Sequence, residues 1–137
     1  MDCIFCKIIS GEIPSAKVYE DDDFIAILDI RPVHLGHTLL IPKKHFRNIY
    51  DTDKEIGEKI YPVLVKLANA IKSALNCDGL NIVQNNEPAG GQEVFHSHIH
   101  LIPRYENDGI RFAIKHKQYE SNEQMAEFAK KIANKLK

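Results

Sequence analysis

The sequence has no long hydrophobic run and no excess of charge of one sign. No uninterrupted apolar stretch approaches the roughly 20 residues of a membrane-spanning helix. Lys plus Arg number 18 and Asp plus Glu number 19, a net charge of −1, so we expect neither nucleic acid nor an anionic membrane as a partner. Glycine (7) and proline (6) are also few, and with 44% hydrophobic residues the composition excludes a disordered or fibrous chain.

Cysteine is scarce as well, and its arrangement argues against an extracellular protein. There are three cysteines, an odd number, and two of them form the pair Cys3-x-x-Cys6, so a disulfide framework is not expected. The first residues lack a basic stretch followed by an apolar one and therefore do not resemble a signal peptide. We expect a cytoplasmic protein.

The hydrophobic pattern predicts one α+β domain. Short β-branched and aromatic runs predict a hairpin and three further strands, at 17–19, 24–28, 37–41, 80–84 and about 96–102. Apolar residues at every third or fourth position predict a long helix over about 53–76, which the capping-box spacing of Thr52 and Glu55 would begin. Pro62 predicts a kink or a late start in that helix. A second amphipathic pattern predicts a C-terminal helix at about 121–136. The sum is a mostly antiparallel five-stranded sheet with helices packed on it.

Three histidines at alternate positions, His96, His98 and His100, give the strongest chemical signal. Because side chains alternate between the faces of a strand, we expect the three imidazoles to project from one face. A polar row on a half-exposed strand is the alternative interpretation, but a titratable cluster near neutral pH more often serves metal binding or proton transfer. The loop before them contains Gly90-Gly91, which could form a backbone nest for phosphate or a plain hairpin turn.

The alternating histidines, followed by apolar residues, resemble the signature of the histidine triad (HIT) family of nucleotide hydrolases and transferases. Further matches lie at 4–9, 12–14, 39–45 and 85–92, so the resemblance covers about residues 3–104. The third triad position is His100 rather than the Gln typical of the family's nucleotidyl transferases, and the resemblance therefore implies a hydrolase. It also implies a single HIT-like domain over 1–137, with its core at about 3–104 and a C-terminal extension.

The resemblance implies a role for each matching residue. His98 would attack the α-phosphorus of a purine nucleotide and form a covalent nucleotidyl-histidine, which water then hydrolyses. The other catalytic residues implied are His100, His37 and Gln92, placed around the phosphate. Nucleotide binding is implied for His98 and His100, for Asp29 at the ribose, for Asn85 and Gln92 at the phosphate, and for Phe5, Ile8 and Leu28 around the base. Without the resemblance, these last three are simply core residues.

The pair Cys3-x-x-Cys6 has the spacing of half a tetrahedral zinc site, and a redox pair is the alternative. The redox motif normally follows a strand and opens a helix, whereas no strand is predicted before Cys3. Many bacterial HIT proteins combine such cysteines with two histidines, so the resemblance implies a structural Zn²⁺ site of Cys3, Cys6, His45 and His96. A catalytic zinc on the three alternating histidines is a further hypothesis, but it leaves the cysteines unexplained.

These observations support three hypotheses for function. The first is a hydrolase of purine nucleoside 5′-phosphoramidates or adenylylated compounds, releasing AMP or GMP; the others are a dinucleoside polyphosphate hydrolase and a nucleotide-binding sensor with incidental turnover. Family members are usually homodimers, and the resemblance implies a homodimer here. Glu93 follows Gln92 where the phosphoramidase branch generally has a serine, so the leaving group is the least determined part of the prediction.

Overall fold

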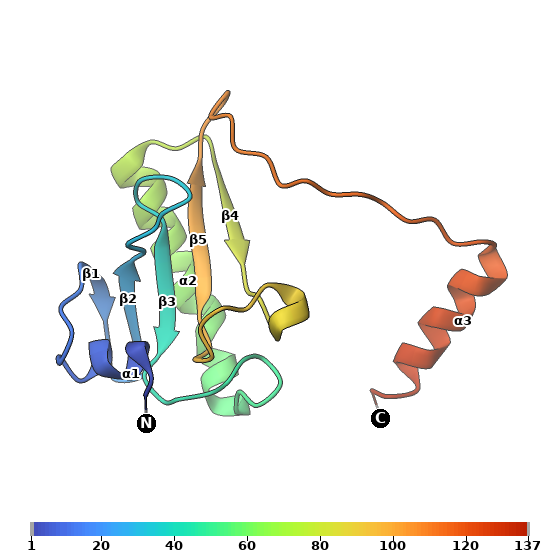
Figure 1. Ribbon diagram of the computed structural model, residues 1–137, viewed down its shortest axis with the longest axis horizontal. Coiled ribbons are helices and arrows are strands. Elements are labelled where there is room, and N and C mark those ends of the chain that lie inside the picture. The colour runs from blue at the N-terminus through green and yellow to red at the C-terminus, as the bar shows by residue number, and fades with distance from the viewer. Residues whose placement is uncertain (1, 137) are drawn as a thin grey trace.

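The computed structural model describes residues 2–136 and contains one five-stranded antiparallel sheet (Figure 1). The strands are β1 Lys17–Glu20, β2 Phe24–Leu28, β3 Thr38–Pro42, β4 Gly79–Val83 and β5 Ile99–Arg104. Their spatial order is β1-β2-β3-β5-β4, and every neighbouring pair is antiparallel. The predicted α+β fold class and five-stranded sheet are confirmed.

Two helices cover opposite faces of the sheet. The helices are α1 Ile4–Ile9, α2 Lys54–Leu75 and α3 Asn122–Ala133, with a short 3₁₀ turn, η1, at Pro88–Gly90. Along β2, Phe24 and Ala26 belong to the core cluster that includes α2, whereas Ile25 and Ile27 belong to the cluster that includes Phe5 of α1. This alternation is the period of two that a strand requires when both its faces are covered. None of the helices in residues 2–136 has the length and apolar character needed to cross a membrane.

The long helix begins one residue later than the capping-box prediction required. Asp53 is the N-cap, and its carboxylate accepts a hydrogen bond of 2.9 Å from the Ile56 N–H. Thr52 instead donates its hydroxyl to the Asn48 carbonyl, so the predicted capping box is wrong. Pro62 lies inside the helix rather than delaying its start. The predicted end is confirmed, since Asn76 adopts the left-handed conformation with φ of 51°.

The last strand begins at Ile99, which corrects the prediction that it includes all three alternating histidines. Only His100 lies in β5, paired with Leu39 of β3 and with Val83 of β4. His96 and His98 lie in the segment that leads into the strand. The Ser97 N–H bonds to the Phe46 carbonyl, outside the sheet, at 2.7 Å, so this segment cannot join the ladder.

The C-terminal helix forms as predicted but does not pack on the sheet. Residues 109–120, here called the arm, form no helix or strand and carry α3 away from the body on the side of β4 (Figure 1). No residue of α3 is buried. The expectation that helices cover the sheet therefore holds for α1 and α2 and is wrong for α3.

Candidate functional site

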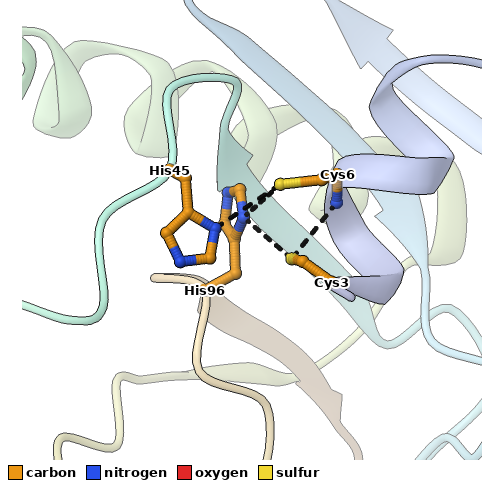
Figure 2. A group of neighbouring side chains, drawn as sticks. All are labelled: Cys3, Cys6, His45 and His96. Carbon is orange, nitrogen blue, oxygen red and sulfur yellow. Dashed lines mark hydrogen bonds between the residues drawn. The ribbon is translucent and has the colours of Figure 1, made fainter. Parts of the chain in front are cut away.

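Four side chains from three distant segments meet beside α1 (Figure 2). The ligand atoms of Cys3, Cys6, His45 and His96 all lie within 4.8 Å of one another. The His96 Nδ1 atom is 3.4 Å from the Cys3 Sγ and 3.6 Å from the Cys6 Sγ, and the His45 Nδ1 atom is 3.4 Å from the Cys6 Sγ. The structure thus brings together the four residues for which the sequence predicted a metal site.

The local fold explains how the two cysteines come to point at the same place. Cys3 is the N-cap of α1, and its sulfur accepts the Cys6 N–H at 3.3 Å. The pair therefore does open a helix, which removes part of the argument against a redox pair. Both cysteines are free thiols. A nitrogen of His45 and a nitrogen of His96 lie beside the two sulfurs, and this arrangement favours a metal site over a redox pair.

The tautomer of His96 suits a metal ligand. Its Nε2 atom lies 2.7 Å from the Pro42 carbonyl oxygen, and because a carbonyl only accepts, we assign the imidazole proton to Nε2. The Nδ1 lone pair then faces the two sulfurs. Burial lowers the pKa of His96 and so favours the neutral ring that ligation requires. A carbonyl that fixes the other nitrogen is the usual support of a metal-bound histidine.

The distances within this group fit a tetrahedral zinc ion. With Zn–S bonds of about 2.3 Å and Zn–N bonds of about 2.0 to 2.1 Å, a tetrahedron has S···N edges of about 3.5 Å. The three S···N distances here are 3.4, 3.4 and 3.6 Å. Burial, then the neighbouring Cys3, raises the pKa of Cys6, so a pair of thiolates at this place requires a compensating cation. The donor set and its spacing therefore suit Zn²⁺.

A second histidine cluster lies beside the first and is linked by hydrogen bonds. The Val33 N–H donates to the His37 Nδ1 at 3.0 Å, and the His37 Nε2 lies 2.8 Å from the His100 Nδ1. The His98 Nδ1 lies 2.6 Å from the carbonyl oxygen of His96. The rings of His98 and His100 pack with their centroids 5.1 Å apart. His37, His98 and His100 thus form one cluster.

The pKa values of this cluster indicate neutral rings at pH 7. Burial lowers the pKa of His37 and of His98. Burial, followed by the charges of His98 and His37, lowers the pKa of His100 to about 4. With neutral rings the proton positions follow from the partners: His37 donates from Nε2 to His100, and His98 donates from Nδ1 to the His96 carbonyl. An unshared lone pair then remains on the His98 Nε2, and a proton remains on the His100 Nε2.

The loop between β2 and β3 positions His37 and Asp29. The loop is closed at its base by a 2.9 Å bond from the Asp29 N–H to the His37 carbonyl. Gly36 has φ of +92°, and a side chain there would collide with Leu75 of α2, so the loop requires glycine. One Asp29 oxygen accepts the Arg31 N–H, and the other lies 3.7 Å from the His37 Nε2. The loop thus brings Asp29, predicted at the ribose, into a group with His37 and His100.

Gln92 is buried, and its amide is occupied within the protein. The amide oxygen accepts hydrogen bonds from the Asn48 side chain and the Glu87 N–H, and the amide nitrogen donates to the carbonyls of Arg47 and Val94. Both donors and both acceptor positions are therefore used. The predicted role of Gln92 at the phosphate stays a prediction. In this structure its side chain joins the segment of Arg47 and Asn48 to the loop that precedes His96.

Glu87 and its partners were missed by the sequence analysis. Arg47 donates two hydrogen bonds to the Glu87 carboxylate, at 2.8 and 2.9 Å, and the Asn48 amide donates a third. These bonds, those of Arg47 first, lower the pKa of Glu87 to about 2. Glu87 also has φ of +69°, which is rare for a residue with a side chain. No local pattern could reveal this set, because the partners lie about 40 residues apart in the sequence.

The remaining predicted residues are distributed unevenly. Phe5 is buried, and its ring edge contacts His98 at 5.0 Å and His96 at 5.9 Å between centroids, so it packs between the two clusters. Ile8 is partly buried beside Phe5, whereas Leu28 is exposed at the end of β2. Asn85 is half-buried and faces Gly91. Their contacts with a nucleotide stay predictions.

Glu93 lies on the side of the Cys/His group. It lines a hollow of about 740 Å³ together with Cys3, His45 and Arg47. A second hollow, of about 550 Å³, lies where β5 passes into the arm and is lined by Arg104 and Asp108.

Among residues 2–136, His96, His98 and His100 do not form one group of metal ligands. The hypothesis of a catalytic zinc on these three histidines is therefore not supported.

Comparison with known proteins identifies the family. Residues 10–107 match the model of the HIT domain. A crystallised HIT family protein from Bacillus anthracis is 49% identical, covers 99% of this chain and 98% of its own, and has a TM-score of 0.91. Adenylylsulfatase HINT3 of Arabidopsis thaliana is 45% identical over 107 residues, which are 78% of this chain and 54% of the plant protein. A Zn-bound histidine triad family protein from Mycobacterium smegmatis is 38% identical, covers 96% of this chain and 98% of its own, and has a TM-score of 0.77.

Proposed function

Because the chain belongs to the HIT family, we propose that it is a nucleotide hydrolase that acts at the α-phosphate through a covalent nucleotidyl-His98. Its substrates are purine nucleoside 5′-phosphoramidates or adenylylated compounds, and its product is AMP or GMP. The observation that carries this proposal is the hydrogen-bond pattern that leaves a lone pair on the His98 Nε2 beside a proton on the His100 Nε2. The name of the plant relative, adenylylsulfatase, supports an adenylylated substrate.

In the first step the His98 Nε2 lone pair attacks the α-phosphorus. The new N–P bond forms as the bond from phosphorus to the leaving group breaks, and the leaving group departs with that electron pair and takes up a proton from water. His98 thereby becomes positively charged. Its Nδ1–H donates to the His96 carbonyl at 2.6 Å, and this charge-assisted bond stabilises the cationic ring.

In the second step water attacks the same phosphorus. The N–P bond breaks, its electron pair returns to the His98 Nε2, and a proton from the water is released with the nucleoside monophosphate. Charge grows on the phosphate oxygens in both steps. The His100 Nε2–H is the donor that stabilises it, because His37 holds the other nitrogen of that ring as an acceptor. His37 is thus a positioning residue.

Cys3, Cys6, His45 and His96 would hold a structural Zn²⁺. Four protein ligands leave no open position, so the ion would supply structure and no chemistry to the reaction. It would tie the start of α1 to the segment before β5. That segment carries the His96 carbonyl on which the orientation of His98 depends. The Zn-bound mycobacterial relative supports this part of the proposal.

We also propose, from the family resemblance, that the protein is a homodimer and that residues 1–137 act as one domain. The long helix and the strand after it would form the usual part of that dimer. Neither point bears on the nucleophile, which is contained within one chain.

The test compares wild type with His98→Asn on adenosine 5′-phosphoramidate and on adenosine 5′-phosphosulfate. We expect AMP release to fall at least about 1,000-fold, because the nucleophile is lost, while the zinc content per chain stays the same. Rapid quenching of the wild type should trap an adenylyl group on the protein. His116→Asn, in the exposed arm, is the matched control and should behave as wild type.

Three results would contradict the proposal. Retained turnover in His98→Asn would exclude the nucleophile. Loss of zinc together with turnover would make His98 a metal ligand. Binding of AMP by a wild type that turns over neither substrate would favour the sensor hypothesis, unless a dinucleoside polyphosphate were cleaved instead.

A further inference from the structure

Glu87 has a backbone conformation that residues with side chains avoid. Its φ is 69° and its ψ is 159°, a combination that is essentially restricted to glycine because a Cβ atom collides with the backbone there. Such a conformation persists only where the surrounding structure compensates for its cost, and it occurs most often at functional sites. Glu87 directly precedes the turn η1, which leads to Gln92. The contacts that hold Glu87 therefore bear on the site.

The backbone of Glu87 closes the turn. The Glu87 carbonyl accepts the Gly90 N–H at 2.9 Å and the Gln92 N–H at 3.1 Å, and the Glu87 N–H donates to the Gln92 side-chain oxygen at 2.8 Å. The angles φ and ψ set the directions of the N–H and the carbonyl relative to each other. If Glu87 relaxed to an ordinary conformation, the two groups could not both keep these partners. The rare conformation thus shapes the turn.

The side chain of Glu87 compensates for the backbone strain. Its carboxylate accepts two hydrogen bonds from Arg47, at 2.8 and 2.9 Å, and a third from the Asn48 amide. Asn48 is buried and is itself held in place, since its amide oxygen accepts the Tyr50 N–H and its N–H donates to the Asp51 carboxylate. Charge-assisted, bidentate hydrogen bonds are among the strongest in proteins. Residues 47 and 48 therefore fix the Glu87 carboxylate.

The same segment, residues 46–48, anchors two other parts of the site. The Phe46 carbonyl accepts the Ser97 N–H at 2.7 Å, and the Arg47 carbonyl accepts an N–H of the Gln92 amide at 2.7 Å. Ser97 belongs to the segment that leads into β5 and carries the candidate nucleophile. The turn and that segment are therefore held relative to each other by one anchor.

We propose that Glu87 is a positioning residue: its carboxylate holds the strained backbone of the turn, and the turn thereby fixes Gln92 relative to His98. In this role Glu87 does not touch the substrate, and Arg47 neutralises its charge. The effect on turnover rests on the proposed hydrolase function, whereas the effect on the turn does not. Glycine adopts the same backbone conformation without strain. The role therefore has an unusual consequence, because glycine at this position would need no carboxylate.

The test compares Glu87→Ala with Glu87→Gly in the full chain. Alanine keeps the strain and removes the compensation, so the turn should relax, whereas glycine removes both. We expect kcat for adenosine 5′-phosphoramidate to fall about 10- to 100-fold in Glu87→Ala, as for a displacement of about 1 Å in a site. In Glu87→Gly, kcat should stay within about 3-fold of wild type. Asn107→Ala and Asn107→Gly, at an exposed residue with φ of 61°, are the matched controls and should behave as wild type.

Amide hydrogen exchange tests the turn without reference to turnover. The N–H groups of Gly90 and Gln92 bond to the Glu87 carbonyl, and they should exchange at least about 10-fold faster in Glu87→Ala than in wild type. In Glu87→Gly they should exchange at nearly the wild-type rate. If exchange followed this order but the wild type released no AMP, the hydrolase proposal would fail and the role of Glu87 in the turn would stand.

Three results would overturn the proposal. Equal exchange rates in the alanine and glycine variants would show that the carboxylate does not compensate for strain. A kcat in Glu87→Gly as low as in Glu87→Ala would make the carboxylate itself necessary for the reaction. Full kcat in Glu87→Ala would show that the turn does not position the site.

A double substitution tests whether Arg47 acts through Glu87. Arg47→Met removes the two bonds to the carboxylate but keeps an apolar stem beside Phe95, over whose ring the guanidinium lies. It should lower kcat about 10-fold in the wild-type background and have no further effect in Glu87→Gly, because the two residues act as one unit. An equal loss in both backgrounds would contradict the proposed anchor.

Discussion

His96 and His98 lie two residues apart, and each donates one imidazole N–H to a backbone carbonyl, yet the two bonds use opposite nitrogens. His96 donates from Nε2 to Pro42, whereas His98 donates from Nδ1 to His96 itself. The first bond leaves Nδ1 facing two sulfurs. The second leaves Nε2 with a lone pair beside His100. The same residue type is thus a candidate ligand in one place and a candidate nucleophile in the next.

The difference shows that carbonyl placement determines what each imidazole can do. His96 is buried and His98 is half-buried, and burial lowers the pKa of each, so both rings are neutral at pH 7. They differ in which nitrogen remains unprotonated and in what it faces. Three predictions test this comparison. The first is expected to change the Cys/His group of His96 and to have the largest effect.

The largest expected effect is on stability, from Cys6→Ser. This change removes one of four ligands, so zinc should be lost and with it the binding free energy that favours the folded state. That contribution is about 4 kcal/mol when free zinc is a thousandfold above its dissociation constant. Zinc content is measured by mass spectrometry, and the free energy of unfolding by urea titration with and without added zinc.

Cys77→Ser is the control for this prediction. Cys77 is buried in the other core cluster, away from the Cys/His group, so the same substitution there should retain zinc. If Cys6→Ser bound zinc as wild type does, or if its stability did not depend on zinc, the group would not be a structural metal site. His96 would then not be a metal ligand, and the contrast between His96 and His98 would not hold.

The sequence predicted the elements better than it predicted the site. Strands with strict patterns, such as 24–28, and the helix that ends at Asn76 depend on local preferences, and the structure has them where expected. The start of β5 was missed because it depends on the bond from Ser97 to Phe46, about 50 residues away. The family resemblance located the four Cys/His residues, whereas spacing alone located only the two cysteines.

Gln92 and α3 show what sequence patterns could not supply. The amide of Gln92 bonds to Arg47 and Asn48, and the sequence gives no sign that those residues lie near it. The pattern of α3 correctly predicted an amphipathic helix, but an amphipathic pattern does not say which surface covers it. Both misses concern partners, which a local pattern does not contain.

The second prediction concerns the link from His37 to His100. His37→Phe keeps a ring of similar shape but removes the Nε2–H that fixes the His100 tautomer. We expect kcat to fall about 10- to 100-fold, by analogy with the loss of a group that orients a metal-bound histidine, with a smaller change in KM. The pH dependence of kcat should change as well, because the remaining His100 can then take either tautomer.

His34→Phe is the control in the same loop. His34 packs against Tyr105 rather than His100, so its replacement should leave kcat near the wild-type value. Equal losses in the two variants would show that the loop as a whole matters, and that His37 has no specific effect on His100.

The smallest expected effect is the loss of stability in mild acid, and its sign follows from His100. Its folded pKa is about 4, whereas an unfolded histidine has a pKa of about 6.5. Between these values the unfolded chain binds a proton that the folded chain excludes, so stability falls as pH falls from 6.5 toward 4 and is constant above that range. At pH 5 the loss from His100 is up to about 2 kcal/mol.

Long-range ¹H–¹⁵N NMR of the imidazoles measures the protonation state and tautomer of each histidine. His100 should remain neutral at pH 5, and at pH 7 His96 and His98 should show opposite tautomers. A His100 that titrates near 6.5 would contradict the predicted loss of stability, and identical tautomers of His96 and His98 would remove the distinction between ligand and nucleophile that the two carbonyls create.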